Sequence, residues 1–108
     1  MKFMVTWRVH PDKREPVLKA FAQMTPEDDQ RDLGNQIKLI GRWHDIADSS
    51  GVAICESEDP IAMSAWALNW NSVLDLEVRM VLDDAEVRAL GQQRIAQQTE
   101  IKTSVVHN

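Results

Sequence analysis

The chain has 108 residues, a mass of 12.3 kDa, a net charge of -5 and a sequence pI of about 5.1, which together indicate one small acidic domain. The acidic balance argues against nucleic acid as a partner, because phosphate binding needs clustered Lys and Arg. The single cysteine, Cys55, excludes an internal disulfide and is typical of a reducing cytoplasm. No run approaches the roughly 18 apolar residues of a membrane-spanning helix, so we expect a cytoplasmic protein without a membrane partner.

The residues from Lys2 to Val9 alternate between apolar and polar side chains, which predicts a half-buried strand. Turn residues, capping residues and prolines near helix starts divide the rest of the chain. The further elements, in order, are a helix near Pro16, a short acidic helix from Thr25 to Gly34, strands 37–45 and 52–56, a helix 59–71, a strand 74–82 and a last helix beginning at Asp83.

This order predicts an α+β fold of the ferredoxin-like type, βαββαβ with an added C-terminal helix. Right-handed crossovers would place both main helices on one face of a four-stranded antiparallel sheet. We expect residues 1–91 to form this single domain. Residues 92–108 are polar and rich in Gln, so we expect an extended, frayed or disordered tail.

Strand periodicity assigns side chains to the two faces of the sheet. The residues expected to face the helices are Phe3, Val5, Trp7, Leu39, Trp43, Leu76, Val78 and Met80. The opposite face would carry Met4, Thr6, Arg8, Ile40, Arg42, His44, Glu77 and Arg79. This mixture of apolar and charged residues favours sheet-to-sheet packing of a homodimer, with Arg8 and Arg42 pairing with Asp75 or Glu77. A solvated sheet face is the alternative.

Four tryptophans, with no tyrosine, are the most informative feature of the composition. Trp7 and Trp43 lie in strands, and Trp66 and Trp70 lie four residues apart in the most apolar helix. We predict that these four residues and Asn69 line a pocket for a hydrophobic or aromatic small molecule. Two structural alternatives remain open: the indoles are core, and Asn69 bonds neighbouring backbone.

His10 and His44 are the candidate proton-transfer residues, although ordinary hydrogen-bonded histidines are an alternative for both. His44 follows Trp43, so it points toward the opposite face unless a bulge redirects it. The acidic residues 27–32 lack the pattern of a calcium loop and are interpreted as a solvated helix start. No metal and no cofactor is expected.

The residues 1–11, 37–45, 65–70 and 81–84 resemble a family of small bacterial proteins known only as a domain of unknown function. The resemblance covers roughly residues 1–91. Its arrangement is similar to dimeric α+β barrels, a superfamily that includes cofactor-free monooxygenases, muconolactone isomerases, stress-responsive proteins and haem-degrading oxygenases. The resemblance therefore implies a dimer, while any activity is an analogy from fold.

The sequence is compatible with three functions. The first is a small-molecule-binding dimeric barrel, such as a cofactor-independent monooxygenase or isomerase, with a cavity of about 300 Å³ or more. The second is a non-enzymatic dimerisation, sensor or interaction module in which the indoles close-pack. Haem binding ranks third, since His44 is expected to face away from the indoles.

Overall fold

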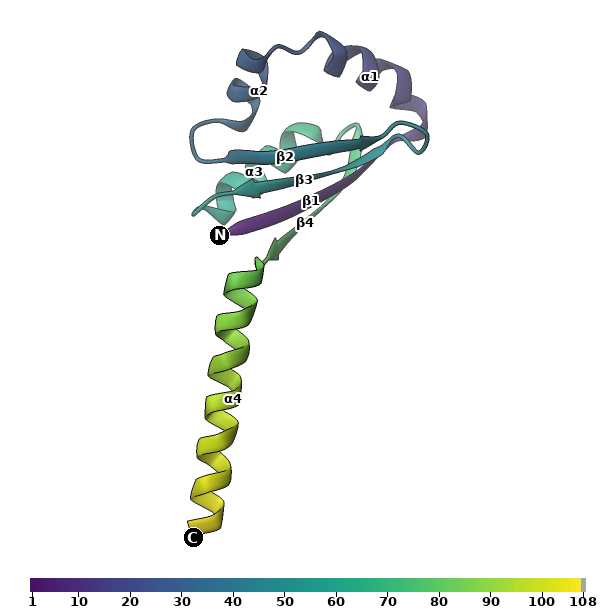
Figure 1. Ribbon diagram of the computed structural model, residues 1–108. Coiled ribbons are helices and arrows are strands. Elements are labelled where there is room, and N and C mark those ends of the chain that lie inside the picture. The colour runs from purple at the N-terminus through teal and green to yellow at the C-terminus, as the bar shows by residue number, and fades with distance from the viewer. Residues whose placement is uncertain (108) are drawn as a thin grey trace.

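The computed structural model describes the backbone of residues 1–107 and the side chains of residues 1–99. Its elements, in order, are β1 Lys2–Val9, a 3-10 turn Pro11–Lys13, α1 Arg14–Gln23, α2 Pro26–Leu33, β2 Lys38–Asp45, β3 Ser50–Glu56, α3 Pro60–Trp70, β4 Leu74–Val81 and α4 Asp84–His107. Figure 1 shows α3 along one side of the sheet and α4 projecting away from the end of β4. No helix in this described part of the chain is long and apolar enough to cross a membrane.

The four strands form one sheet in the order β2-β3-β1-β4, and every neighbouring pair is antiparallel. This order and the two crossover helices are those of the ferredoxin-like fold, so the predicted fold class is confirmed. The alternation predicted for β1 is also confirmed, because Phe3, Val5 and Val9 are buried.

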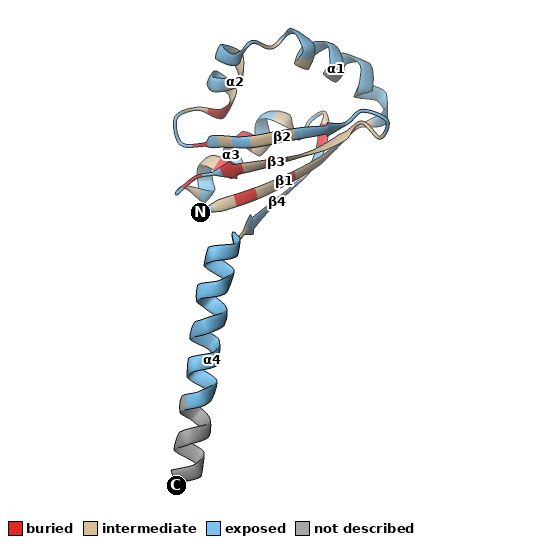
Figure 2. Ribbon diagram, viewed as in Figure 1, coloured by how far each residue is buried: buried red, intermediate tan, exposed pale blue. Residues whose placement is uncertain are grey.

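A packed core occupies the end of the sheet where β1 begins. Phe3 and Val5 from β1 lie there with Ala53 and Cys55 from β3 and with Met63 from α3. Figure 2 shows these buried stretches on the strands beside α3, whereas α4 is exposed. The helix α3 begins at the predicted place, because the Asp59 carboxylate accepts a hydrogen bond from the backbone N–H of Ile61 at 2.9 Å.

A β-bulge interrupts β2 and reverses the faces of its second half. Leu39 pairs with Cys55 and Gly41 pairs with Ile54, which follow each other directly in β3. Ile40 is therefore an extra residue in β2 that has no pairing partner in β3. Because side chains alternate with a period of two, one extra residue moves every later side chain to the other face.

The bulge corrects three assignments made from periodicity. Arg42 pairs with Ala53 and lies on the helix side, as does His44. Trp43 lies on the opposite face and is 59% exposed, so the expectation that it faces the helices is wrong. The expected position of Arg42 and His44 on the far face is wrong for the same reason.

The helix α2 begins with a capping box, in which Thr25 and Asp28 exchange backbone and side-chain hydrogen bonds. It ends at Gly34, whose φ of 75° suits a residue without a Cβ atom. Both boundaries agree with the sequence prediction. The end at Gly34 matters for the site because its backbone N–H donates to the Gln30 carbonyl and closes the last turn, which carries Asp32.

The helix α4 continues well beyond the predicted boundary at residue 91. Asp83 and Glu86 form a reciprocal cap at its start, and every described side chain from residue 84 to residue 99 is exposed. The tail expected to be extended or disordered is therefore helical to His107. Asn108 lies outside the described residues.

Candidate functional site

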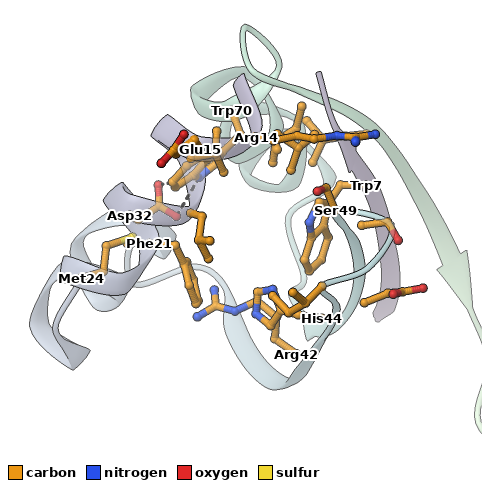
Figure 3. A pocket seen from close by; sticks show the side chains of 18 of the residues that line it. Trp7, Arg14, Glu15, Phe21, Met24, Asp32, Arg42, His44, Ser49 and Trp70 are labelled. Atoms are coloured by element: carbon orange, nitrogen blue, oxygen red, sulfur yellow. Dashed lines mark hydrogen bonds between the residues drawn. The ribbon is translucent and has the colours of Figure 1, made fainter. Parts of the chain in front are cut away.

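A cavity of about 380 Å³ lies between α1, α3 and the end of the sheet away from the core (Figure 3). The apolar side chains around it come from β1, α1 and α3, and they include Trp7, Val17, Leu18, Phe21, Trp66 and Trp70. Polar groups face the same space, namely Arg14, Glu15, Asp32, Arg42, His44 and Asp45.

The cavity exists because α1 does not close onto the sheet. None of its residues is buried, and Leu18 is 52% exposed even though it belongs to the apolar face of the helix. Pro16 lies in the first turn of α1, where its missing N–H costs no hydrogen bond. An apolar helix face that would normally be covered by the core instead lines an open space.

Asp32 holds the two indoles of α3 in place. Its carboxylate accepts a hydrogen bond from Trp66 Nε1 at 2.8 Å, and Trp70 Nε1 lies 3.0 Å from both carboxylate oxygens. These bonds join α2 to α3 across more than thirty residues of sequence. They satisfy both indole donors and orient the two rings that line the cavity.

Arg42 enters the cavity wall from β2 because of the bulge. Its guanidinium donates to both carboxylate oxygens of Asp29, at 3.1 and 3.2 Å, and lies 4.6 Å from the centroid of the Phe21 ring. The Arg42 side chain is only 16% exposed. Its charge is therefore compensated by a carboxylate and by an aromatic face.

His44 faces the cavity beside Arg42. Its ring centroid lies 5.6 Å from that of Trp7 and 4.8 Å from that of Phe21. Burial lowers the pKa of His44, and the neighbouring charge of Arg42 lowers it further. Neutral imidazole is thus the favoured form near pH 7, and a neutral imidazole can accept a proton.

Gly51 provides the space for the Trp7 ring. A Cβ atom at this position would lie 2.2 Å from Trp7 Cζ2 and 2.7 Å from the backbone oxygen of Trp43. The indole therefore lies directly on the backbone of β3, where only glycine fits.

The structure gathers four of the seven predicted site residues around the cavity, namely Trp7, His44, Trp66 and Trp70. Trp43 lies on the other side of the sheet. His10 is absent from the cavity lining, and its Nε2 lies 3.0 Å from Asp75 Oδ1. Asn69 is exposed and borders a separate hollow of about 230 Å³ next to Ala62 and Ala65.

Three important residues of this site were missed in the sequence. Asp32 was grouped with solvated acids, because its partners Trp66 and Trp70 are remote in the chain. Arg42 was assigned to the wrong face by the bulge. Phe21 was visible only as part of an apolar helix stripe, and periodicity does not separate a cavity wall from a core.

Other reactive groups lie apart from the cavity. Burial raises the pKa of the Cys55 thiol to about 11, against a smaller opposing effect of Arg42, so the thiol stays protonated in the core. Among the residues whose side chains are described, no group of three or more His, Cys, Asp or Glu is arranged to hold a metal ion.

The sheet order and the covered face define an α+β domain of the ferredoxin-like type. Residues 1–95 match the family described as Domain of unknown function (DUF3303), and the chain belongs to that family. This chain is similar to one solved structure, that of an uncharacterized NIPSNAP domain protein from Burkholderia xenovorans, with 14% sequence identity and a TM-score of 0.43. That similarity covers 77% of this chain and 95% of the other. No curated protein matches the sequence.

Proposed function

We propose that this domain binds an apolar or aromatic small molecule in the cavity between α1, α3 and the sheet. The observation that carries the proposal is the uncovered apolar face of α1, which has no buried residue and lines a space of about 380 Å³. A ligand in this space would cover Leu18, Phe21 and the indoles, and burial of apolar surface favours binding by about 25 cal/mol per Å².

Tryptophan fluorescence tests this proposal, with matched variants inside and outside the cavity. Purified protein is titrated with quinols, flavonoids and fatty acids, and we expect saturable quenching by at least one class. Trp70→Phe should weaken that binding, because Trp70 lines the cavity. Trp43→Phe removes one indole from the far face and should leave binding unchanged. Equal affinity of the two variants for the ligand, or a lower affinity in Trp43→Phe alone, would contradict the proposal.

His44 extends the proposal to proton transfer. It is the only one of the two candidate histidines that lines the cavity, and its lowered pKa favours the neutral, proton-accepting form. A ligand with an acidic C–H or O–H group would place that proton beside this ring, as a cofactor-independent monooxygenase or isomerase requires. Turnover of such a ligand should fall by at least about a hundredfold in His44→Gln. Unchanged turnover in that variant would overturn this role.

We also propose that the domain works as a homodimer through its open sheet face, defined by Met4, Thr6, Trp43, Val52 and Ile54. These residues lie on the face opposite α3, and the exposed Trp43 ring lies over Gly41. The pairing expected from the sequence changes, because Arg8 bonds Asp48 at 2.8 Å within the chain and Arg42 faces the cavity.

Analytical ultracentrifugation tests the dimer. Ile54→Lys places a charge on the open sheet face and should give monomers, since a buried unpaired charge opposes association. Leu68→Lys changes an α3 residue that is 68% exposed and should leave the mass unchanged. Monomers in the unmodified protein, or a dimer that survives Ile54→Lys, would overturn the proposed interface.

A further inference from the structure

The charge of Asp32 has hydrogen-bond partners but no counter-ion. Both of its bonds come from indole N–H groups, which are neutral donors. No Lys, Arg or His among residues 1–99 forms an ion pair with Asp32. The carboxylate lines the cavity and is only partly exposed to solvent, so its negative charge faces the cavity.

The cations around the cavity are compensated differently. Arg42 is held by Asp29 on one side and by the face of Phe21 on the other. Arg14 in α1 forms no ion pair with a described residue, since the neighbouring Glu15 pairs with Lys19. Three carboxylates line the cavity, Glu15, Asp32 and Asp45, together with the two guanidinium groups. Glu15 pairs with Lys19 at 3.9 Å and Arg42 pairs with Asp29, and both of these partners lie outside the lining. The remaining charges of the wall are therefore two carboxylates, Asp32 and Asp45, against one guanidinium group.

We infer that the natural ligand of this cavity is a lipophilic organic cation, an amine or quaternary ammonium group attached to an apolar body, with Asp32 as its counter-ion. The inference rests on the proposed binding function and adds the charge of the ligand. Aromatic rings attract cations through their negative faces, and a carboxylate beside them supplies the opposite charge. Trp7, Trp66 and Trp70 supply the rings, and Figure 3 shows Asp32 and Trp7 on opposite sides of the cavity.

Three probes of similar shape separate charge from size. Benzyltrimethylammonium is a cation, neopentylbenzene is its uncharged isostere, and benzylsulfonate is an anion on the same benzyl group. Isothermal titration calorimetry on the full chain should give binding at least about tenfold tighter for the ammonium than for the neutral probe. The anion should bind more weakly than either.

Asp32→Asn tests the residue assignment. The amide oxygen of Asn can still accept from an indole N–H, so the variant should remain folded by circular dichroism and keep its affinity for neopentylbenzene. Its preference for the ammonium probe should fall to within about twofold of the neutral one. Asp84→Asn makes the same change of charge at a 90% exposed position of α4, outside the cavity lining, and should keep the preference.

Each other outcome overturns part of the account. Equal affinities for the cation and the neutral probe in the unmodified protein would overturn the inference and leave the binding function standing. Tightest binding of benzylsulfonate would overturn it in favour of an anion site at Arg42. An equal loss of preference in Asp84→Asn would overturn the role of Asp32. No binding of any probe would overturn the inference and the proposed function together.

Discussion

At the scale of single residues, Asp32 connects stability to the site. Its carboxylate joins α2 to the two indoles of α3, so one side chain orients two walls of the cavity. The same atoms that hold the rings also present a negative charge to the space that the rings enclose. A change at this position should therefore affect both folding and ligand binding.

Asp32→Ala should destabilise the fold, because it leaves the N–H groups of Trp66 and Trp70 without their acceptor. Loss of hydrogen bonds to a charged group of this kind costs about 1–3 kcal/mol. Urea unfolding followed by circular dichroism measures the free energy of unfolding. Glu15→Ala is the control at an exposed carboxylate, where we expect a change below about 0.5 kcal/mol. Equal stability of the two variants would show that the indole bonds contribute nothing.

Gly51→Ala should displace the Trp7 ring, since the added methyl group would lie 2.2 Å from Trp7 Cζ2. Overpacking of this kind costs about 1–3 kcal/mol. Gly91→Ala is the matched change in α4, where no atom lies within 4 Å of the added Cβ and helix propensity improves by about 1 kcal/mol. Thermal unfolding should show a lower Tm only for Gly51→Ala. An unchanged Tm of Gly51→Ala would mean that the Trp7 ring does not lie against the backbone at residue 51.

The lowered pKa of His44 predicts a pH dependence of stability. The unfolded state takes up a proton near the ordinary pKa of 6.5, whereas the folded state takes it up at lower pH. Stability is then complete above about pH 6.5 and decreases as the pH falls toward the lower pKa of the folded state. NMR titration of the imidazole C–H signals should show His44 titrating below 6.5, and His44→Gln should remove its part of the pH slope. A His44 pKa above 6.5 would contradict this prediction.

At the scale of elements, the caps and the strand order were predictable from the sequence, and the bulge was not. The capping signals act locally, so their effect can be seen in a few neighbouring residues. They are the aspartate before α3, the proline that begins α3 and the threonine before α2. The extra residue at Ile40 depends on how β2 pairs with β3, and a single strand carries no sign of its partner's register. This one irregularity explains why Trp43, Arg42 and His44 were all assigned to the wrong face.

The candidate site shows the same division between local and long-range information. Trp66 and Trp70 were predictable as site residues because an apolar helix with two indoles is visible in the sequence. Asp32 was not, because its role depends on a contact between α2 and α3. The helical continuation of α4 was missed because its polar composition gives weak periodicity.

The part of α4 beyond residue 91 should be dispensable for folding of the domain. None of its side chains among residues 84–99 is buried, although Lys2 contacts the start of the helix through Asp83 at 3.1 Å and Glu86 at 3.6 Å. A chain ending at residue 91 keeps those contacts. Its urea midpoint should equal that of the full chain, and loss of cooperative unfolding in the shorter chain would show that the rest of α4 supports the core.

At the scale of the whole molecule, the packed core and the cavity occupy opposite ends of one face of the sheet. Phe3, Val5 and Met63 pack together at the first end. At the second end α1 does not pack onto the sheet, and the cavity lies between them. The far face carries the exposed Trp43 and is the face that we propose for a second copy of the chain. The packed core, the proposed binding cavity and the proposed dimer face are thus three separate regions of the fold.

The four indole N–H signals in a proton–nitrogen NMR spectrum test the central claim most directly, because one tryptophan serves as an internal control. On titration with a bound ligand, we predict that the signals of Trp7, Trp66 and Trp70 shift together with one saturation curve. The signal of Trp43 should remain in place, since its ring lies on the other face of the sheet. A saturable shift of Trp43 alone, with the other three unchanged, would contradict the cavity as the binding site.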